Sequence, residues 1–142
     1  MPNLLPDKPP QRMQNLQLFQ VDAFTPKLFG GNPAAIVPLP QFLPDKLLQA
    51  IALENNLSET AYVVGQADGS FYIRWFTPTH EVRLCGHATL GAAHVLLSHS
   101  PPEIDKMVFQ TNEAGRLSVR RKSPGVYTLD LPADLPPITT RL

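Results

Sequence analysis

The sequence predicts an α+β domain in which a mixed β-sheet wraps around one buried helix, with a second helix outside. The main observation is the segment of about residues 86–98, which has the length of a helix and almost no charged side chain. Such a helix is normally buried on most sides. The segment of about residues 44–55 instead places its apolar residues at helical spacing on one face, which indicates an outer amphipathic helix.

The strands are predicted from short apolar runs that lie between turn signals. These runs span residues 16–24, 34–39, 59–64, 71–76, 81–84, 107–111, 116–121 and 125–131. The glycine-containing segment 65–70 separates two of them and predicts a hairpin. Most of the sixteen prolines cluster between the runs. Because proline fixes φ and lacks an amide hydrogen, each cluster marks a boundary between elements.

Composition limits the class of protein. The chain has 142 residues, the length of one domain, and its twelve basic residues balance twelve acidic ones. The balanced charge gives no reason to expect a nucleic acid or a membrane as a partner. A single cysteine excludes an intrachain disulfide and fits a reducing compartment, and no apolar run reaches the length of a membrane span. We therefore expect a cytoplasmic protein.

Three parts of the chain differ in composition. Residues 1–15 are rich in proline and lack an apolar centre, so they predict a flexible tail rather than a secretion signal. Residues 16–135 hold all the predicted helices and strands and form the single domain. Residues 136–142 begin with two prolines, and we expect them to start a linker to a second domain that this chain does not contain.

Glu59 is the first candidate for a chemical role. It begins the predicted strand 59–64, in which Glu59, Ala61 and Val63 share one face if the strand alternates regularly. A carboxylate beside apolar neighbours on a half-buried face is partly desolvated, which suits a general base. The alternative is that Glu59 lies on the solvated end of the strand and has no chemical role.

A second candidate lies where the predicted strand 81–84 gives way to the helix at 86–98. The chain places Cys85, Gly86 and His87 at this junction. Backbone N–H groups at a helix start lack intrahelical partners, and together with the helix dipole they suit a carboxylate or a phosphate. The alternative is structural: Gly86 makes the turn, Cys85 is a small buried residue, and His87 caps its own helix.

Other polar residues stay open between a structural role and a place in a cleft. Asp22 interrupts an apolar strand, and Asn32 lies in a glycine-flanked turn before a proline. His80, His87 and His94 are seven residues apart, which does not fit the i, i+4 spacing of a helical histidine pair. We therefore predict no metal site, and we expect His94 to pack or to form a local hydrogen bond.

Four segments together resemble the N-terminal domain of the PhzF-like family, which is named for phenazine biosynthesis and shares its fold with diaminopimelate epimerase. They are QVDAFTPKLFGGNPAAIV, NNLSETAYVV, IRWFTPTHEVRLCGHATLGAAHVLL and GVYTLDLPA, in the family's order and at its intervals. The resemblance implies a sheet wrapped around a central helix, two pseudo-symmetric domains of this kind, and an active site in the cleft between them. It also implies proton transfer at carbon without a cofactor or a metal.

The resemblance also assigns roles to single residues. The glutamate of LSET, the family's general acid/base, is Glu59 here, and the Gly-His pair at the start of the central helix is Gly86-His87. In the related epimerases that helix start carries a catalytic cysteine, and this chain has Cys85 there. A thiolate is favoured at a helix N-terminus. In PhzF-like proteins, however, the glutamate takes the acid/base role, so we rank Glu59 above Cys85 and expect Cys85 to be dispensable.

Two functional hypotheses follow. In the first, the chain is an isomerase domain that acts on a small molecule with a carboxylate. The residues expected to bind this substrate are Cys85, Gly86, His87, Asn32 and Asp22. In the second, the same cleft wall is non-catalytic and binds a metabolite or a protein. A Glu59 carboxylate that points into bulk solvent, away from the helix start, would favour the second hypothesis.

The family's second domain supplies further active-site residues, and this chain contains no counterpart of it. The chain is therefore a fragment, a truncated product, or a single-domain relative that must pair to complete a cleft. A lone domain would leave an apolar-rimmed wall open to water, and such surfaces usually mark an interaction site. Two copies in an isologous interface would reproduce the pseudo-symmetry, so we predict a homodimer.

Overall fold

The computed structural model describes residues 15–23, 32–131 and 137–142. In chain order its elements are β1 (Phe19–Ala23), β2 (Asn32–Leu39), α1 (Asp45–Asn55), β3 (Glu59–Gly65), β4 (Phe71–Phe76), β5 (Glu81–Val82), α2 (Gly86–Ser98), β6 (Lys106–Gln110), β7 (Arg116–Ser123), β8 (Val126–Asp130) and β9 (Ile138–Arg141). Within these described ranges the strands form one nine-stranded sheet in the order β1-β2-β3-β4-β6-β7-β8-β9, and β5 pairs beside β4.

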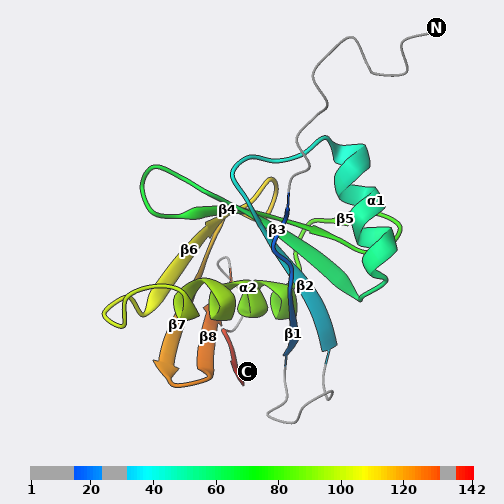
Figure 1. The fold of residues 1–142 in the computed structure, drawn as a ribbon. Coiled ribbons are helices and arrows are strands. Elements are labelled where there is room, and N and C mark those ends of the chain that lie inside the picture. Colours follow the sequence, from blue (N-terminus) through cyan, green and yellow to red (C-terminus); the bar gives the residue numbers. More distant parts are fainter. Residues whose placement is uncertain (1–14, 24–31, 132–136) are drawn as a thin grey trace, which may run out of the picture.

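The sheet is mixed and curls around α2. The pairs β2–β3 and β4–β6 are parallel, and the other neighbouring strands are antiparallel. Parallel neighbours need a crossover connection, which α1 and α2 supply. In Figure 1, α2 lies within the curve of the sheet, where it contacts six strands, and α1 lies apart from it, against β3 and β4. This is the predicted architecture of one central helix and one outer helix.

The inner core surrounds α2, as its apolar composition predicts. Leu90 and Leu97 are fully buried there, and the small residues Ala88, Ala92 and Ala93 are buried as well. Small side chains let the strands approach the helix axis closely. At Gly91 an added Cβ atom would come within 3.4 Å of the Val21 Cβ atom on β1. The small and apolar residues of α2 thus explain both its burial and the close approach of the strands.

The outer core lies between α1 and the other face of the sheet. Leu48 and Ala52 of α1 are buried against β2, β3 and β4, and the buried Tyr62 hydroxyl donates a hydrogen bond of 2.6 Å to the Leu48 carbonyl. Leu47, which shares the helical apolar pattern, is 45% exposed. The helix ends at Asn56 in the left-handed conformation with φ 51°, as the paired asparagines at this point predict. α1 is thus amphipathic, but its buried face is narrower than the apolar pattern predicts, because it includes Leu48 and not Leu47.

The chain end differs from its prediction. Residues 138–141, which we expected to start a linker, form β9 and pair with β8, with Ile138 opposite Leu129. Ile138, Thr139 and Thr140 are β-branched and suit an edge strand, although two prolines precede them. The Ile138 side chain lies near the start of α2, because an added Cβ atom on Gly86 would be 3.4 Å from its Cδ1 atom.

Other predictions are met in part. The expected strand 81–84 is shorter, since β5 covers only Glu81–Val82, and β1 begins three residues later than expected. The predicted hairpin at 65–70 is confirmed by the hydrogen bond from the Gln66 amide to the Ser70 carbonyl. The predicted tail, the first half of the turn at 30–33 and residues 132–136 lie outside the described residues, apart from residue 15 of the tail.

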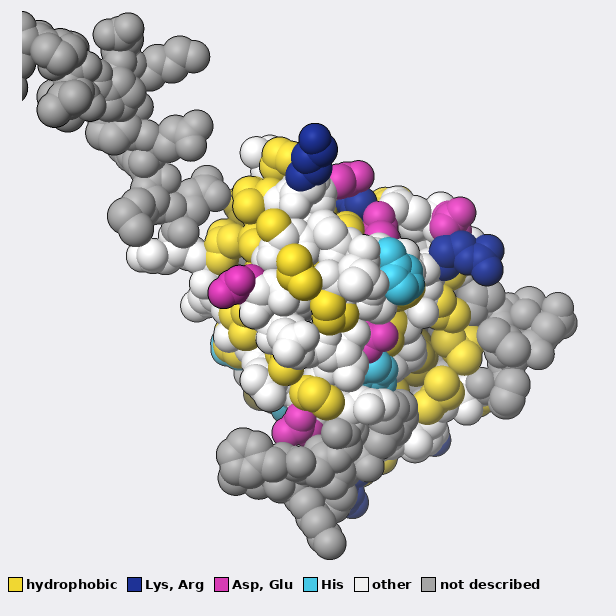
Figure 2. Space-filling view, turned by 90° about the vertical axis from the view of Figure 1, so that its right-hand side faces the viewer, with side chains coloured by type: hydrophobic (Ala, Val, Ile, Leu, Met, Phe, Trp, Pro, Cys, Tyr) yellow, Lys and Arg dark blue, Asp and Glu magenta, His cyan; other side chains and the backbone are white. Residues whose placement is uncertain are grey.

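The surface is mixed in charge. Figure 2 shows acidic, basic and histidine side chains in small separate groups among hydrophobic ones, with no large area of one sign on this side of the molecule. This distribution agrees with the balanced charge of the sequence. Neither helix of the described residues is long and apolar enough to cross a membrane.

Candidate active site

Glu59 is the first residue of β3, and the strand alternates as predicted. Ala61 and Val63 belong to the inner core, whereas Tyr62 and Val64 belong to the outer core under α1. Glu59 has the same parity as Ala61, so its side chain projects to the side of the sheet that holds α2. The solvated strand end that we considered as an alternative does not describe it, because its side chain is only 17% exposed.

Cys85 is the N-cap residue of α2, and its carbonyl fixes the start of the helix. This carbonyl accepts hydrogen bonds from the Thr89 amide at 3.1 Å and from the Thr89 hydroxyl at 2.7 Å. The buried Trp75 indole of β4 donates to the same hydroxyl at 3.1 Å. Thr89 thus links the Trp75 side chain of β4 to the N-cap of α2 by two hydrogen bonds. The sequence analysis did not identify Trp75 or Thr89. Thr89 could have been found, because a threonine four residues after the N-cap can donate its hydroxyl to the N-cap carbonyl.

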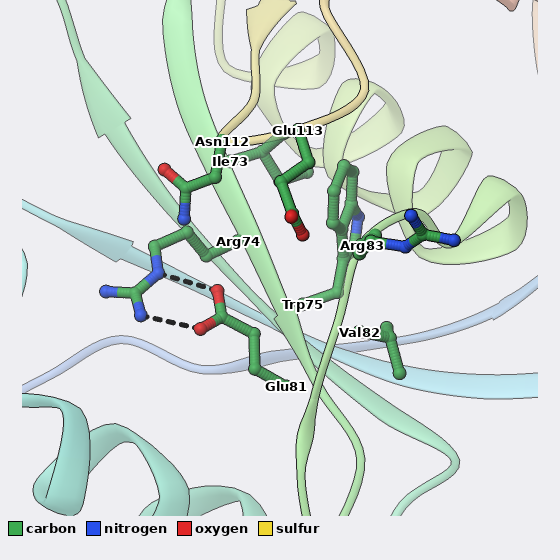
Figure 3. Close-up of a pocket in the computed structure, with 8 residues that line it drawn as sticks. All are labelled: Ile73, Arg74, Trp75, Glu81, Val82, Arg83, Asn112 and Glu113. Carbon is green, nitrogen blue, oxygen red and sulfur yellow. Dashed lines mark hydrogen bonds and ion pairs between the residues drawn. The ribbon is translucent and has the colours of Figure 1, made fainter.

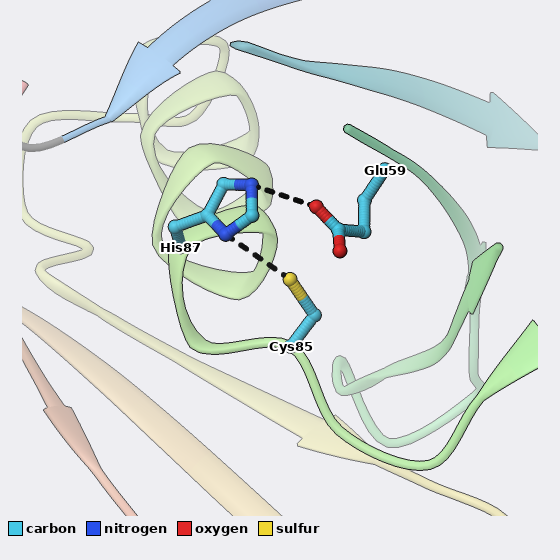
Figure 4. Close-up of side chains that lie close together, drawn as sticks. All are labelled: Glu59, Cys85 and His87. Carbon is cyan, nitrogen blue, oxygen red and sulfur yellow. Dashed lines mark hydrogen bonds and ion pairs between the residues drawn. The ribbon is translucent and has the colours of Figure 1, made fainter. Parts of the chain in front are cut away.

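Glu59, Cys85 and His87 lie together at this helix start, and we call them the trio (Figure 4). The Glu59 Oε2 atom is 3.0 Å from His87 Nε2, and the Cys85 Sγ atom is 3.3 Å from His87 Nδ1. The first contact is close in distance, but its geometry is not that of an aligned hydrogen bond. The strand that carries Glu59 and the helix that carries His87 are separated in sequence, so the fold brings the trio together.

Burial shifts the pKa of two members of the trio, Cys85 and His87. It raises the pKa of the Cys85 thiol to about 12; amide groups of the first helical turn oppose this shift, and the Glu59 charge adds to it. Burial also lowers the pKa of His87, although the Glu59 charge opposes that shift. At neutral pH the site therefore contains a protonated thiol beside a neutral imidazole.

The trio combines complementary polar groups. The Cys85 thiol lies beside Nδ1 of the His87 ring, and the Glu59 carboxylate lies beside Nε2. A carboxylate oxygen only accepts hydrogen bonds, whereas the two nitrogens of a neutral imidazole are one donor and one acceptor.

The strand register separates Asn32 from Asp22. Asn32 has the parity of Ile36, which lies in the inner core, so alternation places it on the sheet face of Glu59. Asp22 follows Val21, whose side chain packs against the inner core, so it lies on the opposite face. The register therefore supports Asn32 as a neighbour of the site and does not support Asp22.

The histidine prediction is met for His94. Its ring packs edge-on against Tyr127, and its Nδ1 atom lies 2.8 Å from the Tyr127 hydroxyl, so the residue packs as predicted, with a hydrogen-bond partner 33 residues away rather than a local one. The prediction of no metal site depended on the spacing of histidines along the chain. The fold instead gathers a carboxylate, a thiol and an imidazole whose donor atoms all lie within 4.8 Å of one another, namely those of the trio.

A cavity of about 210 Å³ lies elsewhere, where β4 leaves β6 to pair with β5 (Figure 3). Its wall includes Arg74, whose guanidinium forms two bonds of 2.8 Å with Glu81 and one of 3.1 Å with Asp45. The charge of Arg74 is thus already balanced by the protein. No member of the trio lines this cavity.

Comparisons with known proteins agree with this picture. The profile of the PhzC-PhzF family, described as phenazine biosynthesis-like protein, matches residues 21–142. A Pseudomonas aeruginosa protein named as an uncharacterized isomerase is 52% identical over 121 residues, which cover 85% of this chain and 46% of that protein. A Halalkalibacterium halodurans protein of the same description is 43% identical over 126 residues, which cover 87% of this chain and 46% of that protein.

A solved structure shows the same domain. The crystal structure of an Enterococcus faecalis phenazine biosynthesis protein of the PhzF family matches with a TM-score of 0.74 and 43% identity, over 80% of this chain and 43% of that chain. The fold is that of a PhzF or diaminopimelate epimerase-like domain, a curled mixed sheet with two helices. The chain belongs to the PhzC-PhzF, phenazine biosynthesis-like family. It spans less than half the length of the curated relatives it matches.

Proposed function

We propose that this chain forms one half of an isomerase active site in which Glu59 transfers a proton at a carbon atom of a small, carboxylate-bearing substrate. The observation that carries the proposal is the 3.0 Å contact between Glu59 and His87 at the start of α2. The carboxylate does not point into bulk solvent away from the helix, as it would in the non-catalytic alternative. Relatives named isomerases support the reaction class.

Glu59 has the exposure that a general acid/base needs. Its side chain is 17% exposed and that of His87 is 11% exposed, so a ligand can reach the carboxylate while protein shields most of it. A positioned acid/base contributes about 10²–10⁴-fold to the rate of a reaction. His87 acts here as a positioning residue, because its ring touches the carboxylate.

The helix start supplies the binding site for the substrate's own carboxylate. α2 begins at Gly86, and the positive end of its helix dipole favours an anion there. Hydrogen bonds from backbone N–H donors to a carboxylate are charge-assisted. Cys85 contributes a small neutral neighbour, and Asn32 lies on the same sheet face as a further candidate for binding.

The other half of the site comes from a second domain of the same fold. Moving a proton from one position of a substrate to another needs groups beyond the single carboxylate of this chain. A second copy of this chain or a further domain of a longer protein would supply them. In either case the trio forms one wall of the completed cleft.

Deuterium uptake from heavy water tests the role of Glu59. The chain is incubated with a panel of cyclic and linear amino acids and related carboxylates, and exchange at carbon is followed by NMR. We expect Glu59→Gln, a nearly isosteric change, to lower exchange by about 10²-fold or more with unchanged circular dichroism. The matched control is Glu54→Gln, which alters an exposed glutamate on α1.

Two results would oppose the proposal. Undiminished exchange in Glu59→Gln would show that another group is the base. Tight binding of a panel compound with no exchange in the unaltered chain would instead support the non-catalytic binding module. Exchange retained in Glu54→Gln shows that losing an exposed glutamate does not by itself lower it.

A further inference from the structure

We propose that Glu59, Cys85 and His87 also form a binding site for a thiophilic divalent cation such as Zn²⁺, and that a bound cation blocks proton transfer by Glu59. The cation is an inhibitor here and takes no part in the reaction. The site follows from the three donor atoms that the fold gathers, which the spacing of residues along the chain does not reveal.

The distances suit a small tetrahedral ion. Zinc binds sulfur at about 2.3 Å and imidazole nitrogen at about 2.0 Å, so two such ligand atoms lie about 3.5 Å apart. The Cys85 Sγ and His87 Nδ1 atoms are already 3.3 Å apart. One donor atom of each of the three residues lies within 4.8 Å of the others, so the coordination of an ion bound between Sγ and Nδ1 is completed when the Glu59 carboxylate turns from His87 Nε2 toward it. Water would fill the fourth position.

The chemistry of the donors selects the class of cation. Thiolate, imidazole and carboxylate are the ligand types that Zn²⁺ uses in proteins, and Co²⁺ accepts the same set. Mg²⁺ and Ca²⁺ prefer sites made of oxygen atoms, which this cluster does not offer. The cation replaces the thiol proton, and the two charges of thiolate and carboxylate then balance its own.

The surrounding protein holds the cysteine ligand in place. The Cys85 carbonyl accepts hydrogen bonds from the Thr89 amide and hydroxyl, and the Trp75 indole donates to that hydroxyl. Such outer contacts orient metal ligands and raise affinity. The His87 and Glu59 side chains are 11% and 17% exposed, so the cluster is not sealed from solvent.

The inhibitory consequence rests on the proposed function, whereas the binding itself does not. A carboxylate bound to a cation no longer offers the lone pair that takes a proton. His87 also becomes a ligand of the ion and no longer orients Glu59. Occupancy of the site would therefore abolish exchange without disturbing the fold.

Cobalt makes the site visible, because Zn²⁺ has a filled d shell and gives no spectrum. The full chain is titrated with Co²⁺ in a phosphine reductant that does not bind metal strongly. We expect saturation at one ion per chain, with a thiolate-to-cobalt band in the near ultraviolet and reversal by Zn²⁺. Cys85→Ala should lose the thiolate band, and Glu59→Gln and His87→Gln should each weaken affinity tenfold or more. His94→Gln is the matched control and should bind like the unaltered chain.

Each result decides a separate point. No cobalt binding at millimolar concentration, or a spectrum that Cys85→Ala leaves unchanged, would overturn the metal site. Circular dichroism of every variant shows whether a loss of binding reflects a loss of fold. Saturating Zn²⁺ should also remove deuterium exchange in the unaltered chain. Metal binding with full exchange would overturn the inhibition and count against Glu59 as the base, while leaving the metal site established.

Discussion

The Cys85 thiol lies at a helix N-terminus, where the helix dipole favours a thiolate. Burial nevertheless raises its pKa to about 12, and the neighbouring Glu59 charge acts in the same direction. Desolvation therefore outweighs the dipole at this residue. The raised pKa agrees with the expectation that Cys85 is dispensable for proton transfer.

Alkylation measures this protection directly. At pH 8 we expect iodoacetamide to modify Cys85 in the native chain at least a hundredfold more slowly than in the denatured chain, because little thiolate is present. Cys85→Ala should keep most of the deuterium exchange of the unaltered chain. A loss of exchange as large as that of Glu59→Gln would point to a thiol mechanism, and rapid native alkylation would contradict the raised pKa.

At the scale of single elements, α2 contributes to two separate side-chain clusters. Cys85 and His87 of the trio lie at its start, and His94 in its second half contacts Tyr127 on β8. Burial lowers the pKa of His94, and the positive charge of Arg121 adds to this effect. The neutral form of His94 is therefore favoured in the folded state.

Acid should weaken the fold through His94. Its pKa is lower in the folded state than the ordinary value of 6.5, so below about pH 6.5 the unfolded chain binds more protons and stability falls as the pH falls. We expect the urea midpoint to drop between pH 7.5 and pH 5.5, and to drop less in His94→Gln. The lowered pKa of His87 acts in the same direction and remains in both proteins.

A control separates His94 from histidines in general. His80 is exposed, and His80→Gln should show the same acid-induced drop as the unaltered chain. An equal drop in all three proteins would show that His94 does not control the effect.

Elements with a strong local pattern could be predicted from the sequence. The bounds of α2 match the predicted 86–98, because a helix without charged side chains contrasts with its surroundings. β9 was missed, since its four residues follow prolines and gain their strand structure only by pairing with β8. The sheet face on which the Glu59 side chain lies was predicted from the alternation of side chains along the strand.

The composition of the site could be predicted only in part. Glu59, Cys85 and His87 were each identified, but their contacts depend on where α2 lies relative to β3, which no local pattern encodes. The hydrogen bonds of Trp75 and Thr89 at the helix start depend on the same placement of α2 against the sheet. The sheet faces of Asn32 and Asp22 could be assigned only once the strands β1 and β2 showed which of their neighbours, Val21 and Ile36, pack in the inner core.

At the scale of the whole molecule, the sheet is open at both ends of its path. In the described residues β1 and β9 each pair with a strand on one side only. Leu16 and Leu18, just before β1, are exposed by 37% and 46%. Unpaired edges and exposed apolar side chains both favour contact with another chain or domain.

We expect the 15.7 kDa chain to form a dimer at micromolar concentration. A second copy would provide the facing wall that the pseudo-symmetric family arrangement implies, and one self-complementary surface is enough for a two-fold interface. Light scattering coupled to gel filtration measures the mass. A monomer would contradict the dimer and would point instead to a missing domain as the partner. Pairing through a sheet edge is the main alternative geometry.

The hydrogen-bonded path from Trp75 through Thr89 to Cys85 gives the protein an optical reporter of its own. Trp75 is the only tryptophan of the chain and is 2% exposed, so its fluorescence comes from one site shielded from water. Its indole N–H lies two hydrogen bonds from the helix start. A ligand that shifts this turn should change the emission intensity, and bound cobalt should quench it by energy transfer. Occupancy of the helix start could thus be followed by fluorescence without any added label.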